Sequence, residues 1–213
     1  NSFPLKSAFR ISRDSKTKAD VVTVTLTRNG VQGWGECVPY ARYGETTASV
    51  IEQLQSATPQ ITCAQLIETL PAGAARNALD CAIWDLIAKE TNTRVWQLAE
   101  LPKPQPVQTA FTISLDTIEN MTRAAAENAH RPILKLKLGT PDDLERLVAV
   151  RNAAPDAKLV IDANEGWTPD DYRILLDHLV ALEIALIEQP FPVGHDECLT
   201  KLDRPIPICA DES

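Results

Sequence analysis

Short apolar runs recur at nearly constant intervals in the second half of the chain. Their starts are separated by 24, 25, 26 and 22 residues, and each run except the last is followed by a stretch with helical character. The runs cover residues 109–114, 133–138, 158–162, 184–188 and 206–210. They are too apolar to leave one face of a sheet in solvent, which is typical of parallel strands covered by helices. We therefore predict serial βα units, which fit either a barrel or an open doubly wound sheet.

The first half of the chain has a different pattern. Residues 20–27 alternate between apolar and polar side chains, and Asn29-Gly30 separates them from a second run at 31–38. This arrangement predicts a hairpin with a tight turn. Helices are expected at about 47–56 and 72–89, and the second has apolar residues at helical spacing. Strands followed by helices suggest an α+β unit.

A proline-rich segment, LPKPQPVQ at 101–108, predicts a boundary between the two patterns. The fold class is therefore α/β, with an α+β capping domain at 1–105 and βα units at 106–213. Within the second part, Thr140 and Thr168 each precede Pro-Asp-Asp. A capping hydroxyl, a proline and then acidic residues are typical of a helix start, so we expect both threonines to cap helices.

Composition narrows the classes of function. The chain has 213 residues, with 21 Lys+Arg against 29 Asp+Glu and a net charge of −8. This acidic balance argues against a nucleic-acid partner, and no apolar run approaches the ~20 residues that would span a membrane. The five cysteines are odd in number and form no CxxC pair. Reduced thiols in a cytoplasmic protein are the simplest interpretation.

Three carboxylates stand where predicted strands end. They are Asp162, Glu188 and Asp211, one βα unit apart from each other. In a barrel they would converge at the C-terminal rim, where active sites are built. Oxygen ligands without His or Cys suit Mg²⁺, with Mn²⁺ as an alternative. Each acid alone could simply cap a helix, but capping does not explain Glu188, which Gln189-Pro190 follows.

The run LKLKL places Lys135 and Lys137 on one face of a strand, roughly 6.6 Å apart. In an antiparallel sheet this would be a solvated face. In a barrel the leucines would face the helices and the lysines the interior. A neighbouring cation and partial desolvation both lower the pKa of a lysine, so Lys137 could act as a base. Together with a divalent cation that stabilises an enolate, this predicts proton abstraction next to a carboxylate.

The sequence resembles the muconate-lactonising subgroup of the enolase superfamily, and most closely its dipeptide epimerases of the L-Ala-D/L-Glu type. The motifs that carry the resemblance are GWGECVPYARYGET, LPAGAARNALDCAIWDL, LKLKLG, VIDANEGW, LIEQP and ICADES. It implies a capping domain followed by a (β/α) barrel of the enolase type, a lysine base with Mg²⁺ and a small dipeptide substrate. It also implies a possible homo-oligomer and a role in peptidoglycan recycling.

The resemblance implies a role for each candidate residue. Asp162, Glu188 and Asp211 would bind the metal. Lys137 would be the acid/base on one face of the substrate, with Lys135 beside it in contact with the substrate carboxylate. The remaining candidates are Asn164 and Glu212, which would orient the metal ligands, and Thr112 and Arg13, which would contact substrate, Arg13 from a loop that folds over the site.

Length qualifies this interpretation. A full barrel takes ~250 residues, and residues 106–213 hold five predicted strands. We therefore expect the chain to be truncated after the fifth barrel strand, without the second acid/base lysine, and these 213 residues alone to be inactive. The alternatives are a cycloisomerase or an o-succinylbenzoate synthase of the same subgroup, or a non-catalytic fragment that needs an assembly partner.

Overall fold

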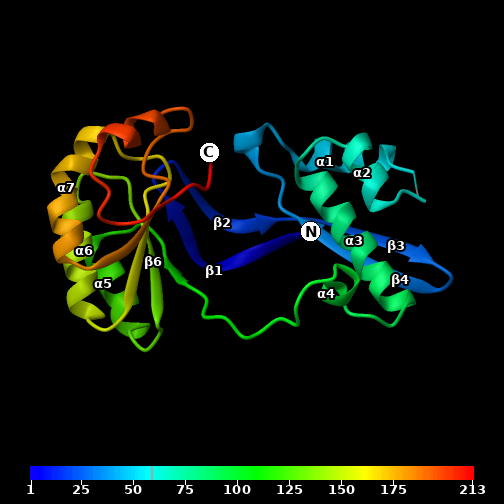
Figure 1. The fold of residues 1–213 in the computed structure, drawn as a ribbon, viewed down its shortest axis with the longest axis horizontal. Coiled ribbons are helices and arrows are strands. Elements are labelled where there is room, and N and C mark those ends of the chain that lie inside the picture. Colours follow the sequence, from blue (N-terminus) through cyan, green and yellow to red (C-terminus); the bar gives the residue numbers. More distant parts are fainter. Residues whose placement is uncertain (59) are drawn as a thin grey trace. The chain divides into compact units, whose positions relative to one another are not determined.

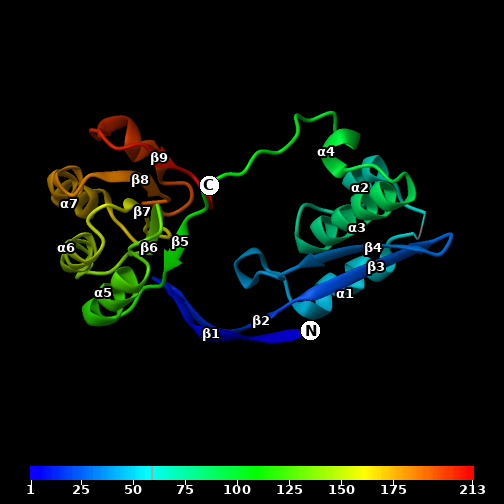
Figure 2. The same ribbon diagram turned by 90° about the horizontal axis from the view of Figure 1, so that it is seen from below.

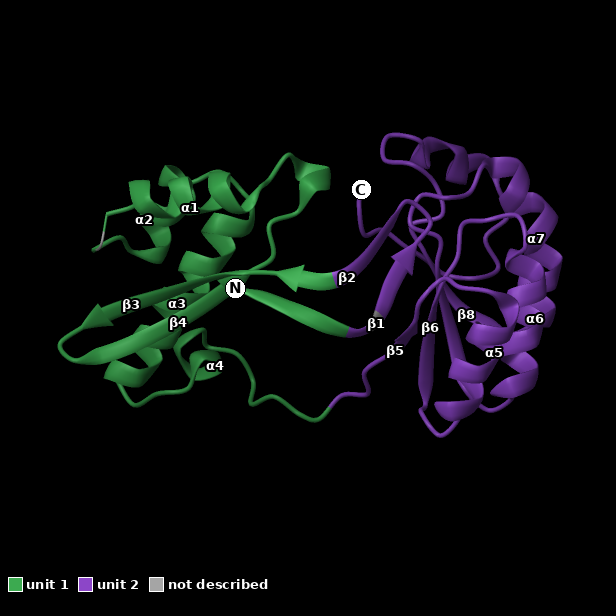
Figure 3. Cartoon of the chain, turned by 180° about the vertical axis from the view of Figure 1, so that it is seen from behind, with its two compact units in different colours: residues 1–5, 18–106 green, residues 6–17, 107–213 purple. Residues whose placement is uncertain are grey.

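The computed structural model describes residues 1–58 and 60–213, and of Ser7 only the backbone. The chain forms two compact units, coloured separately in Figure 3. Unit 1 comprises residues 1–5 and 18–106, and unit 2 comprises residues 6–17 and 107–213. The expected boundary after residue 105 lies one residue from this division, whereas residues 6–17 cluster with unit 2.

Unit 1 contains an antiparallel hairpin of β3 (Val22–Arg28) and β4 (Val31–Cys37), in the positions expected from the alternating pattern. Asn29 and Gly30 form its turn with φ angles of 52° and 80°, the left-handed values that a two-residue hairpin turn requires. The other elements of the unit are the short helix η1 (Ala41–Tyr43), α1 (Thr47–Ser56), α2 (Cys63–Thr69), α3 (Ala74–Glu90) and α4 (Val95–Leu98). The predicted helices at 47–56 and 72–89 correspond to α1 and α3.

Helix α3 lies directly on the β3–β4 hairpin. A Cβ added to Gly35 would come within 1.9 Å of the carbonyl oxygen of Ala78, and one added to Gly33 within 2.3 Å of that of Ala82. The two glycines of VQGWGEC thus allow the helix backbone to approach the strand. Around this contact the small and branched side chains of the helix form the core of the unit with Val22.

Unit 2 contains a five-stranded parallel sheet in the order β5-β6-β7-β8-β9 (Figures 1 and 2). Its elements are β5 (Phe111–Ile113), α5 (Ile118–Glu127), β6 (Ile133–Lys137), α6 (Asp143–Ala153), β7 (Lys158–Asp162), α7 (Pro169–Ala181), β8 (Ile184–Glu188), η2 (Asp196–Lys201) and β9 (Ile208–Cys209). Each strand pairs with the next one along the chain. A doubly wound sheet reverses its order midway, so the sequential order identifies part of a barrel and decides between the two predicted arrangements.

One face of this sheet packs against helices α5, α6 and α7, as Figure 2 shows. Leu134, Leu136 and Leu138 are fully buried there, in one cluster with Leu147 of α6 and Leu179 of α7. The prediction that the leucines of LKLKL face the helices is confirmed. The lysines therefore lie on the opposite face of β6.

Thr168 caps α7, as predicted, but Thr140 does not cap α6. Thr168 accepts a hydrogen bond from the backbone N–H of Asp171, whose carboxylate accepts from the backbone N–H of Thr168. Helix α6 instead begins at Asp143, three residues after Thr140. The prediction for Thr140 is wrong because its hydroxyl accepts from the guanidinium of Arg146 and donates to Asp143 Oδ1, and does not accept from a backbone N–H of the helix. The buried carboxylate of Asp143 also accepts from the backbone N–H groups of Gly139 and Thr140 and from the indole N–H of Trp167.

A second hairpin, of β1 (Ser2–Ile11) and β2 (Asp14–Asp20), was not expected from the sequence. Its tip belongs to unit 2, where the backbone N–H of Leu115 donates to the carbonyl of Arg10. Among the residues that the structure describes, no helix has both the length and the apolar character needed to cross a membrane. The five cysteines are all free thiols.

Candidate metal centre and active site

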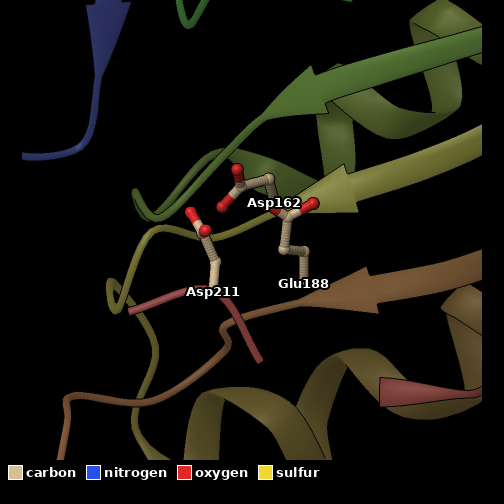
Figure 4. Close-up of side chains that lie close together, drawn as sticks. All are labelled: Asp162, Glu188 and Asp211. Carbon is tan, nitrogen blue, oxygen red and sulfur yellow. The ribbon is translucent and has the colours of Figure 1, made fainter. Parts of the chain in front are cut away.

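Three carboxylates meet at the C-terminal edge of the parallel sheet. Asp162 is the last residue of β7, Glu188 is the last residue of β8, and the two are in register. Asp211 follows β9 by two residues. One carboxylate oxygen from each lies within 4.8 Å of the other two (Figure 4). Asp162 is fully buried, Glu188 half-buried and Asp211 exposed, so the cluster opens to solvent on one side.

Two lysines from β6 lie against these acids. Lys137 is in register with Asp162, and its Nζ atom donates to Asp162 Oδ2 over 2.5 Å. Lys135 Nζ lies 2.7 Å from Glu188 Oε1 and 3.0 Å from Asp162 Oδ2. The ring of Phe9, on β1, lies near the ammonium of Lys137, 5.9 Å from Nζ to the ring centroid. The two lysines, Asp162 and Glu188 therefore form one hydrogen-bonded network.

The charges of this network shift the pKa values of its members. Burial alone would raise the pKa of Asp162, but hydrogen bonds and charge attraction from Lys137 and Lys135 lower it. Burial would likewise lower the pKa of Lys135, yet its bonds to Glu188 and Asp162 raise it. Burial raises the pKa of Glu188, and the negative charges of Asp162 and Asp211 oppose the lowering effect of Lys135. The cluster thus has an excess of negative charge around Glu188.

Asn164 and Glu212 are hydrogen-bonded to each other, and Asn164 is also hydrogen-bonded to Asp162 of the cluster. The backbone N–H of Asn164 donates to Asp162 Oδ1 over 2.9 Å, and its side-chain Nδ2 lies 3.3 Å from Glu212 Oε1. Arg13, at the tip of the β1–β2 hairpin, donates to Glu212 Oε1, to Glu165 Oε2 and to the backbone carbonyl of Asn164. Arg13 therefore binds acidic groups of the protein in this structure, and its contact with a substrate stays a prediction.

The donor set fits a hard cation. Besides the three carboxylates, two buried acceptor atoms among the described residues have no hydrogen-bond partner, Asn164 Oδ1 and Glu212 Oε2. Buried oxygen acceptors without donors are unfavourable unless a cation or an ordered water satisfies them. Carboxylate and carbonyl oxygens suit hard cations such as Mg²⁺ and Mn²⁺. Asp162, Glu188 and Asp211 are thus the residues that could hold the metal.

Unusual backbone conformations surround the cluster. Asn164, Glu165 and Gln189 have φ angles of 44°, 68° and 35°, in the left-handed region that non-glycine residues rarely adopt. Such conformations persist only where the surroundings enforce them, and they gather at functional sites. The loops after β6 and β7 also cross closely, since a Cβ added to Gly166 would lie 2.6 Å from the Cα of Gly139.

Thr112, a candidate from the sequence, lies on β5 in register with Lys135 and so beside the lysine pair. The structure also adds residues that the sequence did not indicate. Phe9 and Asp143 were not among the candidates, and Gln189 was recognised only as part of the EQP motif. The position of Gln189 between Glu188 and Pro190 indicated a functional motif, but the sequence does not reveal what the Gln189 side chain binds.

Comparisons with known proteins place this geometry in a family. Residues 2–99 match the family described as mandelate racemase / muconate lactonizing enzyme, N-terminal domain. Residues 116–213 match the family described as enolase C-terminal domain-like. Together the two matches include all of the lysines and acids described above.

The curated relatives include epimerases and racemases. The L-Ala-D/L-Glu epimerase of Escherichia coli (strain K12) is 43% identical, over 100% of this chain and 68% of its own length. The N-acetyl-D-glutamate racemase of a Pseudoalteromonas species is 41% identical, over 91% of this chain and 63% of its own length. The chain therefore spans about two thirds of the length of these relatives.

A solved structure agrees closely with the fold. An enolase family member from Agrobacterium tumefaciens with homology to dipeptide epimerases, with sodium and L-Ala-L-Glu bound, has a TM-score of 0.96 and 46% identity, covering 100% of this chain and 67% of its own. Both domains match these families, the strand order is that of a barrel, and the chain is 43% identical to the curated epimerase. The chain therefore belongs to the enolase superfamily and has the domains of its mandelate racemase and muconate lactonizing group.

Proposed function

We propose that the protein is a Mg²⁺-dependent epimerase of dipeptides of the L-Ala-D/L-Glu type, which removes and returns the proton on the α-carbon of the second residue. The observation that carries the proposal is the direct contact between the paired lysines of β6 and a cluster of three carboxylates. The epimerase activity of the relatives supports the choice of reaction. Because the chain spans about two thirds of those relatives, the proposal concerns the whole protein.

The metal site would consist of Asp162, Glu188 and Asp211. When bound, the cation would supply positive charge that stabilises the enolate formed from the substrate carboxylate. Mg²⁺ suits these oxygen ligands, and Mn²⁺ accepts the same set. Asn164 would orient Asp162 through its backbone N–H, and Glu212 would hold Asn164 in place.

The proton transfer would be the task of the lysines. Lys137 is buried at the end of β6, where Nζ would take the α-proton on one face of the substrate. Lys135 is more exposed and would contact the substrate carboxylate with its ammonium group. Thr112, beside Lys135, and Arg13, on the hairpin tip, are the further candidates for substrate contact. A homo-oligomer, a cytoplasmic location and a role in peptidoglycan recycling stay predictions.

Exchange of the α-proton tests the proposal. The whole protein is incubated with Mg²⁺ and L-Ala-L-Glu in D₂O, and the glutamate α-proton is followed by NMR. We expect loss of that signal and appearance of L-Ala-D-Glu. Lys137→Ala should abolish exchange from the face that this lysine serves, whereas Lys158→Ala, an exposed lysine at the opposite end of the same sheet, should not. The proposal would be refuted if the unaltered protein gave no exchange of the α-proton and no D-epimer.

A second candidate is racemisation of an N-acylated glutamate, favoured by the 41% identity to an N-acetyl-D-glutamate racemase. Both substrates place an acyl nitrogen and a carboxylate on the same α-carbon, so the same lysines and metal would serve. Parallel NMR assays with N-acetyl-L-glutamate separate the two by their kcat/KM ratio. Muconate and o-succinylbenzoate precursors in the same assay test the cycloisomerase and synthase alternatives.

A further inference from the structure

We propose that Gln189 is a positioning residue that holds Asp211 in place for the metal. The proposal rests on the proposed function, because it assigns to Asp211 the third metal carboxylate. Gln189 follows Glu188 directly, at the end of β8, and its side chain is 1% exposed. It acts on the neighbouring strand rather than on the metal.

The carboxamide oxygen of Gln189 binds the backbone of the segment that carries Asp211. Gln189 Oε1 accepts from the backbone N–H groups of Asp211, Glu212 and Ser213, at 2.9, 3.1 and 3.2 Å. Three consecutive amides thus converge on one atom. This segment needs such a support because β9 ends at Cys209, so Asp211 lies beyond the ladder that positions Asp162 and Glu188.

The other end of the carboxamide fixes its orientation. Gln189 Nε2 donates to the carbonyl of Phe191 and to the hydroxyl of Ser213, each over 2.9 Å. Donors therefore face the oxygen and acceptors face the nitrogen. A rotated amide would set Nε2 against three N–H groups, and an apolar side chain would leave all five partners without this bond.

The backbone of Gln189 connects the same three strand ends. Its N–H donates to the carbonyl of Cys209 on β9, and its carbonyl accepts from the N–H of Glu165 after β7, each over 2.9 Å. Gln189 makes these two bonds with a left-handed φ of 35°. The unusual conformation therefore lies at the residue whose carboxamide binds the Asp211 segment.

The first experiment measures metal affinity apart from turnover. Mn²⁺ binding to the whole protein is titrated by calorimetry and by electron paramagnetic resonance. Gln189→Met should weaken Mn²⁺ binding by about 10-fold or more, as is typical when a group that orients a ligand is removed. The control, Ser213→Ala, removes one partner of Nε2 and keeps the three bonds to Oε1, so its affinity should change less than ~3-fold. Equal affinity of Gln189→Met and the unaltered protein would overturn the proposal.

The second experiment needs no metal. Amide hydrogen exchange in the metal-free protein should show protection at residues 211–213 that Gln189→Met loses and Ser213→Ala largely keeps. Free exchange of these amides in the unaltered protein would overturn the proposal. Should Gln189→Met not fold, Gln189→Glu is the second variant. Its carboxylate still accepts from the three amides but the side chain no longer donates to Phe191, so we expect reduced protection at residues 211–213 that exceeds the loss in Ser213→Ala. Gln189→Ala removes the acceptor itself, and unchanged protection of these amides in that variant would overturn the proposal. Absence of dipeptide epimerisation, with Mn²⁺ binding and amide protection as expected, would contradict the proposed function alone.

Discussion

Asp143 connects the loops that follow two strands of the candidate site. The residue is 1% exposed, and its carboxylate accepts from the N–H groups of Gly139 and Thr140 and from the indole of Trp167, at 2.8, 3.1 and 2.8 Å. Gly139 follows β6, which carries Lys137, whereas Trp167 lies beyond β7. We therefore expect Asp143→Ala to loosen both loops.

The magnitude follows from these contacts. A hydrogen bond to a charged group contributes about 1.5–3 kcal/mol, so the three bonds from N–H groups amount to roughly 4.5–9 kcal/mol. The hydroxyl of Thr140 donates a fourth bond over 3.2 Å. Burial of the carboxylate opposes this by several kcal/mol. We expect Asp143→Ala to lower the free energy of unfolding by about 3 kcal/mol. Trp167→Phe removes one donor while keeping an aromatic ring, and should lower it by about 1.5 kcal/mol.

Urea unfolding of the two single variants and the double variant provides the assay. Both substitutions remove the same hydrogen bond. Trp167→Phe should therefore lower the free energy of unfolding only slightly when Asp143 is already alanine, which gives a coupling energy of about 1.5 kcal/mol. The control is Asp177→Ala, at an exposed position of α7, with a change within about 0.5 kcal/mol. Additive effects of Asp143→Ala and Trp167→Phe, or a loss below about 1 kcal/mol for Asp143→Ala, would refute the reasoning.

Two further predictions concern stability. Gly35→Ala would place a Cβ 1.9 Å from the carbonyl oxygen of Ala78, so the helix must move, and we expect thermal unfolding to show a loss of about 1–3 kcal/mol or more. Thr168→Ala removes a helix cap and should cost about 1 kcal/mol at pH 7 in urea unfolding. Hydrogen bonds from Thr168 lower the pKa of Asp171, so their stabilisation is present above the unfolded pKa and is lost as the pH falls through the folded one. The difference between Thr168→Ala and the unaltered protein should therefore narrow below about pH 4.

Matched variants control both predictions. Gly30 has a φ of 80° and no atom within 4 Å of an added Cβ, so Gly30→Ala should cost about 1 kcal/mol from backbone strain alone. A smaller loss for Gly35→Ala than for Gly30→Ala would contradict the close approach of helix α3. Thr168→Ser keeps a capping hydroxyl and should restore most of the stability. A Thr168→Ala difference that stays constant from pH 7 to about pH 3 would contradict the role of Asp171.

The sheet of unit 2 and its acids were predictable because the relevant patterns are local. Alternation within LKLKL separates the leucines from the lysines, and an acid at the end of a buried strand lies at the edge where parallel strands end together. The regular spacing then brings Asp162 and Glu188 side by side. These inferences need only the period of a strand and the direction of the sheet.

Other features depended on contacts between distant parts of the chain. The β1–β2 hairpin was missed because β2, DSKTKAD, has no buried face and hence no alternation to detect. Thr140 has the same local sequence as Thr168, but its hydroxyl binds Arg146, and the carboxylate of Asp143 binds Gly139 and Trp167, which are contacts that the local sequence does not reveal. The role of Gln189 requires the register of β8 and β9 together with the path of the chain beyond it.

The left-handed residues at the strand ends have a consequence for directed evolution. Each non-glycine residue in that conformation costs about 1–2 kcal/mol, so Asn164, Glu165 and Gln189 together consume a sizeable part of the ~5–15 kcal/mol by which a domain is stable. Glycine at any of them would relieve backbone strain and delete the side chain. At Gln189 that deletion removes five buried hydrogen bonds and outweighs the relief of strain, so stabilising libraries should hold all three residues fixed.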